Sequence, residues 1–248
     1  MYTDTEGIIL RQTKIVGGRR MLVLFSKKYG KISAGSFINE KGRSKSALAM
    51  RPFTHGRYEL YKKGSYFNIN GAETIESYYR IGEDVDKYMN ASYCLELVDK
   101  LLEEGEPAPG LFNLTCDLLA EMEKRRGRYL TLVLAFEVKA LRQIGYLPEL
   151  DRCVSCGKEK EAAAFNVPGG GIMCADCAKY TKNTNRDLLI YDIDFGIVNV
   201  LKYFLGHPLE SLEKLALKEE NISLIRTILR EYLRYHLGIE ELKSENLI

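Results

Sequence analysis

Four cysteines near the middle of the chain constrain its fold more than any other feature. They form two Cys-x-x-Cys pairs, Cys153 with Cys156 and Cys174 with Cys177, separated by seventeen residues. Each pair can form a tight turn that points two sulfur atoms at one ion, and this spacing is typical of a four-thiolate zinc site. Gly157 after the first pair and three consecutive glycines before the second allow the backbone to turn. The spacing therefore predicts one structural Zn²⁺ in a zinc ribbon at residues 150–182.

An all-cysteine site favours a structural ion over a catalytic one. A catalytic zinc keeps a position for water and usually has histidine or carboxylate ligands. None of the three histidines, His55, His207 and His236, is followed two residues later by Glu, the pattern that a zinc deaminase requires. Two disulfides are the alternative, but Cys94 and Cys116 are left over and no secretory signal pattern is present at the N-terminus. We therefore expect a reducing, cytoplasmic environment.

Length and motif content narrow the class of protein. The 248 residues are enough for two modest domains, and the 46% hydrophobic and 28% charged residues describe an ordinary globular chain. No apolar run approaches the roughly 18 to 20 residues of a membrane span. The chain contains no phosphate-binding loop, no Gly-x-Ser-x-Gly elbow and no His-Glu-x-x-His helix. We therefore expect a binding protein without a membrane partner, and not an enzyme.

The charge is distributed unevenly along the chain. Residues 1–80 hold 15 Lys and Arg against 6 Asp and Glu, a net charge of +9, whereas residues 81–248 hold 21 against 28, a net charge of −7. This contrast predicts two domains, at 1–80 and 81–248. A basic first domain points to a polyanionic partner, above all nucleic acid, with a solvated basic face as the simpler alternative.

The first 80 residues read as a small β-barrel. Short segments rich in Val, Ile, Tyr and Phe are bounded by turn residues, which predicts five strands. These strands are Glu6 to Thr13, Arg20 to Ser26, Lys31 to Phe37, Gly56 to Tyr61 and Tyr66 to Ser77. Closure into a barrel removes the edges that so small a sheet would expose, so we predict an OB-fold; an SH3-like barrel would give a similar pattern.

The longest connection in this barrel, Ile38 to Phe53, is also its most basic, and its Gly and Ser content predicts a polar, mobile loop. Such a loop can follow a phosphate backbone while aromatic rings stack on bases. The candidate DNA-binding residues of the loop are Lys41, Arg43, Lys45 and Arg51. The candidate stacking residues are Phe37, Phe53, Tyr58, Tyr61, Tyr66 and Phe67, of which we expect about one third to be exposed, because the barrel also needs a core.

After Tyr79 the apolar period becomes helical, which predicts an α-helical domain with the zinc ribbon inserted in it. The expected helices run from Tyr88 to Leu102, Leu111 to Met122, Tyr129 to Ile144, Phe195 to Leu205 with Asp194 as cap, Leu209 to Leu217, and Asn221 as cap to Gly238. Further candidate DNA contacts are a basic cluster after the second helix and a row on the last helix, whose alternative is a solvated face. These residues are Arg125, Arg126, Arg128, Arg226 and Arg230. The predicted fold class is thus α+β and multidomain.

Several segments together resemble the bacterial DNA-repair family RecO. They are Thr5 to Leu10, Leu22 to Phe25, Tyr29 to Lys31, Arg51 to Phe53, Glu59 to Tyr61, the four cysteines, and Arg230 to Gly238 followed by Leu242 to Ser244. Their order and spacing cover the whole chain, although no single segment is specific. One departure is the ending Glu245 to Ile248, because the family often ends in a more basic segment; we therefore expect no DNA contact from the last residues.

The resemblance implies a recombination mediator of the DNA-damage (SOS) response, located in the cytoplasm at the nucleoid. Such a protein binds single- and double-stranded DNA, anneals complementary strands and, with RecR, helps load RecA onto DNA coated by single-stranded-DNA-binding protein. It also docks the acidic, apolar C-terminal tail of that coat protein. From the residues alone, an OB-fold RNA-binding factor and a zinc-ribbon scaffold that binds only proteins remain open.

Overall fold

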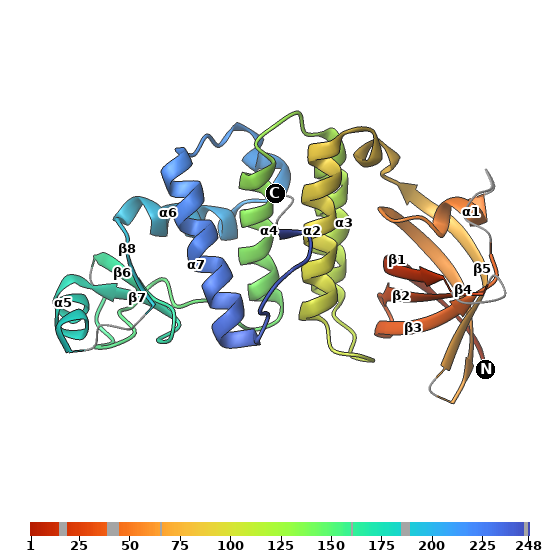
Figure 1. Cartoon of the computed structure of the whole chain (residues 1–248), viewed down its shortest axis with the longest axis horizontal. Helices are drawn as coiled ribbons and strands as arrows, with labels where there is room; N and C mark the ends of the chain where they lie inside the picture. Colours follow the sequence, from red (N-terminus) through yellow and green to blue (C-terminus); the bar gives the residue numbers. More distant parts are fainter. Residues whose placement is uncertain (15–18, 39–44, 65, 160, 185–188, 246–247) are drawn as a thin grey trace. The chain divides into compact units, whose positions relative to one another are not determined.

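The computed structural model describes residues 1–14, 19–38, 45–64, 66–159, 161–184, 189–245 and 248 (Figure 1). The chain forms two compact units, one made of Met1–Arg125 with Lys243–Ile248 and the other of Arg126–Leu242. The sequence predicted a domain boundary after residue 80, where the spacing of apolar residues changes from that of strands to that of helices. This boundary stays a prediction. No helix in the described part of the chain combines the length and the apolar character that crossing a membrane requires.

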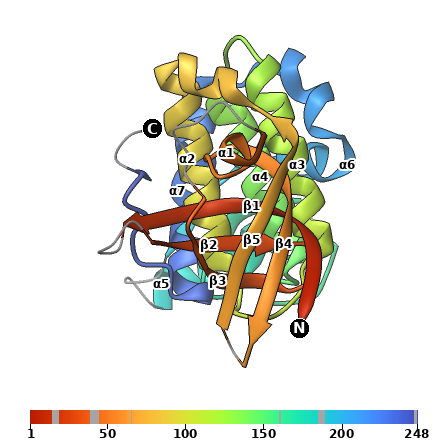
Figure 2. The same ribbon diagram turned by 90° about the vertical axis from the view of Figure 1, so that its right-hand side faces the viewer.

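Five strands of the first unit close into a barrel (Figure 2). They are β1 (Tyr2–Lys14), β2 (Arg20–Ser26), β3 (Gly30–Ser36), β4 (Thr54–Lys63) and β5 (Tyr66–Ser77). The long β1 pairs antiparallel with β4 through its first half and with β2 through its second half, and β3 pairs in parallel with β5. The order β1-β2-β3-β5-β4 is that of a five-stranded OB-fold, which confirms the predicted fold.

The connection between β3 and β4 contains a short helix, α1 (Lys45–Ala49), where the sequence predicted a mobile polar loop. This part of the prediction was wrong, because the helix has an apolar side that packs into the barrel. Ala47, Ala49 and Met50 are buried with the strand residues. The buried Tyr58 hydroxyl on β4 donates a 2.6 Å hydrogen bond to the Ala49 carbonyl, which fixes the helix in place.

Two helices complete the first unit. A 3-10 turn, η1 (Tyr79–Glu83), leads into α2 (Val85–Leu101), and α3 (Pro109–Lys124) follows. Asp84 caps α2 by accepting a hydrogen bond from the backbone N–H of Lys87. The ring of Phe112 on α3 meets Phe25 of β2 edge to face, with centroids 5.2 Å apart. The predicted helices 88–102 and 111–122 are therefore confirmed, each with an earlier start.

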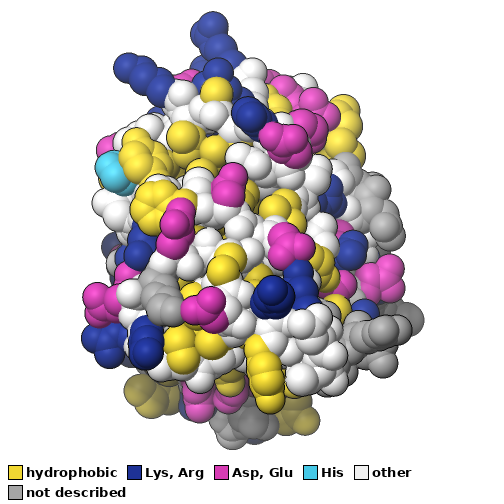
Figure 3. Space-filling view, turned by 90° about the vertical axis from the view of Figure 1, so that its left-hand side faces the viewer, with side chains coloured by type: hydrophobic (Ala, Val, Ile, Leu, Met, Phe, Trp, Pro, Cys, Tyr) yellow, Lys and Arg dark blue, Asp and Glu magenta, His cyan; other side chains and the backbone are white. Residues whose placement is uncertain are grey.

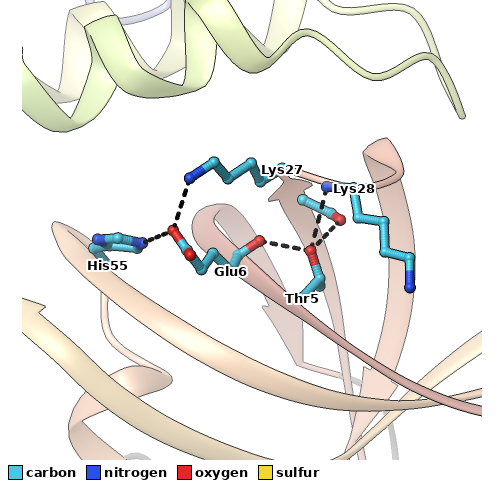
Figure 4. A network of polar contacts seen from close by, with 6 residues as sticks. Thr5, Glu6, Lys27, Lys28 and His55 are labelled. Carbon is cyan, nitrogen blue, oxygen red and sulfur yellow. Dashed lines mark hydrogen bonds and ion pairs between the residues drawn. The ribbon is translucent and has the colours of Figure 1, made fainter.

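A polar network joins β1, β4 and the turn after β2 (Figure 4). The Glu6 carboxylate accepts a 3.2 Å hydrogen bond from the Lys27 ammonium, and the same oxygen lies 3.2 Å from His55 Nε2. Burial by itself raises the pKa of Glu6, but the hydrogen bond and charge of Lys27, with those of His55, lower it overall. Burial lowers the pKa of His55 and outweighs the opposing effect of Glu6. The network thus favours an ionised carboxylate beside a neutral imidazole.

The second unit is built around α4 (Tyr129–Gln143), which is buried along most of its length, as its nearly uniform apolar sequence predicted. The other elements are β6 (Ala162–Asn166), β7 (Gly171–Cys174), α5 (Ala175–Thr184), β8 (Ile190–Asp192), α6 (Phe195–Gly206), η2 (Leu209–Lys214) and α7 (Glu219–Leu237). Helices α6 and α7 and the turn η2 contact α4, and the strands form a sheet in the order β7-β6-β8.

The ends of these helices test the predicted caps. The Asp194 carboxylate accepts from the backbone N–H of Ile197, and Gly238 ends α7 with φ of 64°, so both of these predictions are confirmed. The prediction that Asn221 caps α7 was wrong, because the helix begins at Glu219, where two acidic residues favour the positive end of the helix dipole. The segment 209–217, predicted as a helix, forms only the 3-10 turn η2.

Candidate nucleic-acid interface and metal centre

The four cysteines predicted as metal ligands come together in the second unit. Cys153 and Cys156 lie in the turn before β6, Cys174 ends β7 and Cys177 lies in the first turn of α5. Their sulfur atoms all lie within 4.8 Å of one another. Zn–S bonds of about 2.3 Å in a tetrahedron place sulfur atoms roughly 3.8 Å apart. The cluster can therefore hold a metal ion after a small contraction.

Local backbone geometry directs these sulfur atoms inward. Gly157 adopts a φ of 71°, and its N–H donates a 2.8 Å hydrogen bond to the Cys153 carbonyl, which closes the first turn. Burial acts to raise the pKa of Cys153, but backbone N–H groups around its sulfur lower the pKa to about 6. Hydrogen bonding from Cys174 and the other thiols raises the pKa of Cys177 to about 12. Without an ion, the pKa of one thiol is thus lowered while that of another is raised. A bound cation would stabilise the thiolate form of all four cysteines.

On the barrel, two basic residues are paired with one acid of helix α2. Arg11 Nε lies 2.7 Å from Asp99 Oδ2, and the Lys31 ammonium donates a 2.6 Å hydrogen bond to the Asp99 carbonyl while lying 3.6 Å from Oδ1. One acid on α2 therefore holds both side chains against the helix and offsets one of their two positive charges.

A different group of cations surrounds exposed aromatic rings. The guanidinium of Arg19 donates a 2.7 Å hydrogen bond to Asn68 Oδ1 and lies 5.8 Å from the centroid of Phe37. It also lies over Gly35, where an added Cβ would approach Arg19 Nη2 to 2.6 Å. The absence of a side chain at Gly35 thus leaves room for a cation that is held in place before any ligand binds.

Next to Arg19 is a largely apolar cavity of about 700 Å³. It is lined by Arg19, Met21, Lys63, Gly64, Tyr66, Phe67 and Asn68. Tyr66 is 73% exposed and Phe37 is 75% exposed, so both rings are accessible to a ligand. An accessible ring beside a fixed guanidinium and an amide can stack on an unpaired base and bind its phosphate. We name this surface, with Lys62 and Lys28 described next, the barrel aromatic face.

Two further lysines extend the barrel aromatic face. The Lys62 ammonium lies 5.2 Å from the centroid of Phe67 and 5.9 Å from that of Tyr29, and the Lys28 ammonium lies 5.4 Å from Tyr29. Each cation is thus held over an aromatic ring. Lys62 and Lys63 were not among the DNA contacts predicted from the sequence. Their position a few residues before Tyr66 could have indicated a basic and aromatic surface. No pattern in the sequence indicated that Arg19 and Asn68 contribute to it.

The DNA contacts predicted from the sequence differ in their exposure, and some of them lie outside the described residues. Lys41 and Arg43 lie outside the described residues, as does the side chain of Lys45, and Arg51 is exposed before β4. The prediction for Arg125 was wrong, because its side chain is 1% exposed and pairs with Glu121 at 3.0 Å, so that it cannot reach a phosphate.

The remaining predicted contacts belong to the second unit. Arg126 and Arg128 are exposed, and Arg128 donates a 2.8 Å hydrogen bond to the Glu213 carbonyl. Arg226 is half-buried, and Arg230 lies 3.6 Å from Glu231 on the same helix. Among the six candidate stacking residues, Phe53, Tyr58 and Phe67 are buried, whereas Phe37 and Tyr66 are strongly exposed. Two exposed rings of six agree with the one third expected from the sequence.

A second cavity of the first unit, about 710 Å³, lies along α2. Its wall includes the basic residues Arg11, Lys31, Lys100 and Lys243, the acids Glu96 and Asp99, and the apolar residues Ile9, Phe53 and Leu95. Glu96 accepts hydrogen bonds from the backbone N–H groups of Lys243 and Ser244, each at 2.9 Å. Phe53 adopts a φ of 56°, a strained value for a bulky residue that often marks a functional site. We name this cavity the α2 groove.

Family models match nearly the whole chain. The model described as recombination protein O N terminal matches residues 1–78, and the model described as recombination protein O C terminal matches residues 82–246. The chain belongs to the RecO family.

Relatives named DNA repair protein RecO are similar along most of their length. The RecO of Alkaliphilus metalliredigens is 33% identical over 240 residues, which cover 96% of this chain and 94% of the relative. That of Thermoanaerobacter sp. is 29% identical over 249 residues, covering 98% and 96%. That of Pelotomaculum thermopropionicum is 32% identical over 240 residues, covering 96% and 90%. All three of these relatives are bacterial proteins whose name assigns them to DNA repair.

Proposed function

We propose that this chain is a recombination mediator in DNA repair. It binds single- and double-stranded DNA, anneals complementary strands and, with RecR, helps load RecA onto DNA coated by single-stranded-DNA-binding protein, in the cytoplasm at the nucleoid. Membership of the RecO family supports a DNA-repair role. The observation that carries the DNA-binding part is the barrel aromatic face, where Arg19, held by Asn68, lines the same cavity as the exposed ring of Tyr66.

The proposed mechanism is electrostatic. Lysines and arginines that bind phosphates release condensed counterions, and they reduce the repulsion between two strands that are about to pair. Bases that stack on Tyr66 or Phe37 are held unpaired and separated from one another. Each such stacking contact stabilises the complex by roughly 1 to 3 kcal/mol. Base pairing then selects the correct partner strand. The protein acts by binding and positioning, and no reactive side chain takes part.

The basic residues predicted from sequence remain proposed contacts beside this face. They are Lys41, Arg43, Lys45 and Arg51 of the barrel, and Arg126, Arg128, Arg226 and Arg230 of the second unit. The exposure of Arg51, Arg126 and Arg128 is compatible with phosphate binding.

We propose that the ion in the cysteine cluster is one structural Zn²⁺ bound by Cys153, Cys156, Cys174 and Cys177. Four sulfur donors prefer zinc among the common biological cations, and they leave no position for a water nucleophile. The ion joins the turn before β6 to the start of α5, so its role is to stabilise the zinc ribbon.

The α2 groove is the proposed site for the tail of the coat protein. Its two acids are engaged, Asp99 by Arg11 and Lys31 and Glu96 by backbone N–H groups. The groove therefore keeps a positive excess around an apolar wall, which complements a tail that is both acidic and apolar. The side chains of Lys100 and Lys243 are the proposed partners of its carboxylates.

Annealing of complementary oligonucleotides, followed by fluorescence, tests the proposal. Faster pairing on strands already coated with single-stranded-DNA-binding protein supports the mediator role, because it requires action on both the DNA and its coat. Faster pairing on bare strands alone supports DNA binding but contradicts the mediator role. A preference for RNA would favour an RNA-binding factor, and no effect on either substrate would favour a protein-binding scaffold.

A further inference from the structure

A groove of the second unit has a different chemical character from the surfaces described above. It lies between α6 and the β6–β7 hairpin, with a volume of about 770 Å³. Its floor is apolar and buried, formed by Leu150, Ala162, Ile172 and Val198. Phe195, the first residue of α6, stands at its wall and is 55% exposed. On the face of the second unit seen in Figure 3, exposed hydrophobic side chains lie among acidic and basic ones. We name this cavity the α6 groove.

One wall of the α6 groove is held rigidly by backbone contacts. The N–H of Glu149 donates to the Gly170 carbonyl at 2.9 Å, and the N–H of Ile172 donates to the Glu149 carbonyl at 3.0 Å. A side chain at Gly171 would bring a Cβ to 2.3 Å from the Glu149 carbonyl oxygen, so this close approach requires glycine. The Glu149 carboxylate in turn accepts from the backbone N–H of Asp151 at 2.7 Å, which fixes its direction.

The rim of the groove is predominantly acidic. Four acids, Glu149, Asp151, Glu159 and Glu161, stand against two bases, Arg152 and Lys202. Lys202 lies 2.6 Å from Asp151, with 44% and 76% of the two side chains exposed, and Arg152 lies 3.4 Å from Glu159, with 63% and 73% exposed. Ion pairs this exposed are weak, so an incoming cation can exchange with either base without leaving a buried charge. The rim repels phosphate and attracts cationic groups.

We propose that the α6 groove binds a basic segment of a partner protein. An apolar side chain of that segment packs against Phe195 and the apolar floor, while flanking Lys or Arg side chains pair with Glu149 and Glu161. The proposal does not depend on DNA binding, and the partner it specifies has the opposite charge to the acidic tail assigned to the α2 groove. The second unit thereby holds a protein ligand at a site that nucleic acid avoids.

Binding of a labelled peptide to the full-length, zinc-loaded chain tests this proposal by fluorescence anisotropy. The probe is a fluorescein-labelled nonapeptide with a central Leu-Phe-Leu flanked by three Arg and three Lys, and the matched control carries Glu at all six flanking positions. We expect the basic peptide to bind at least about tenfold more tightly than the acidic one. Phe195→Ala should weaken binding about fivefold or more, and Glu161→Gln by a smaller factor.

The matched control variant is Tyr180→Ala, which removes another strongly exposed ring, on α5, outside the groove. It should leave peptide binding unchanged. A benzophenone group in place of the peptide's Phe should crosslink to residues 149–162 or 195–202. The proposal is overturned if the basic peptide fails to bind, if Phe195→Ala binds it normally, or if the crosslinks fall elsewhere. Binding of single-stranded DNA by Phe195→Ala should be normal, which separates this result from a failure of the proposed DNA-binding function.

Discussion

The salt dependence of DNA binding gives the sharpest test of the barrel aromatic face. Four cations, Arg19, Lys28, Lys62 and Lys63, are linked through the rings of Tyr29 and Phe67 and the cavity beside them. The perturbation is the double variant Lys62→Gln with Lys63→Gln. It removes two positive charges but keeps side chains that are long and polar, so the β4–β5 turn should be retained.

The expected magnitude follows from counterion release. Each phosphate neutralised on a single strand contributes about −0.7 to the slope of log affinity against log salt, so the four cations of this face contribute about −2.8. This contribution alone lowers affinity about 50-fold between about 50 and 200 mM salt, and any further contacts add to it. In the double variant the slope should be less steep by about 1.4, so that the fall in affinity over the same range is about sevenfold smaller.

Fluorescence anisotropy of a labelled oligothymidine at several salt concentrations measures this slope. The control is Arg11→Gln with Lys100→Gln, which removes the same charge from the α2 groove. It should lower affinity slightly through the net charge and leave the slope unchanged. A wild-type slope in the double variant, or an equal decrease in the control, would refute the assignment of DNA to the barrel aromatic face.

Three further results are expected. Cys153→Ser should lose the metal and unfold the zinc ribbon, since a structural zinc contributes about 10 to 16 kcal/mol of apparent binding energy; metal analysis and circular dichroism would show this, with Cys116→Ser as the control that keeps the metal. Stability should decrease as the pH falls below 6.5, because the lowered pKa of His55 favours the neutral ring in the folded state; in thermal denaturation His55→Gln should reduce this decrease, and an unchanged profile would contradict it. Tyr58→Phe should reduce the free energy of unfolding by about 1 to 3 kcal/mol in urea titration, because it leaves a buried carbonyl without its donor; a loss near zero would show that the hydroxyl does not fix α1.

The pH prediction has a definite sign. The folded state holds His55 with a pKa below its ordinary value of 6.5, so protons bind more readily to the unfolded chain, and acidification favours unfolding. Glu6 adds a second loss at lower pH. Its pKa is below the ordinary 4.5, so its contribution is present above that pH and disappears as the pH falls through the folded pKa.

Local patterns predicted the parts of this protein whose structure depends on neighbours in sequence. The Cys-x-x-Cys spacing indicated the cluster, because each turn needs only adjacent residues to point two sulfur atoms in one direction. The caps at Asp194 and Gly238 were evident for the same reason. Alternating apolar residues gave the strands, and the number and length of the strands were enough to predict a closed barrel.

The tertiary structure alone decided which side chains are available to a ligand. Arg125 is in a basic cluster of the sequence, yet its side chain is buried and paired with Glu121, one turn earlier in the chain. Arg19 meets Asn68 across forty-nine residues, and that contact exists only because strand pairing closes the barrel. Exposure and long-range contact are properties of the folded backbone as a whole. The sequence by itself therefore determined most of the elements and the cysteine cluster, whereas closure of the barrel determined which side chains meet on the barrel aromatic face.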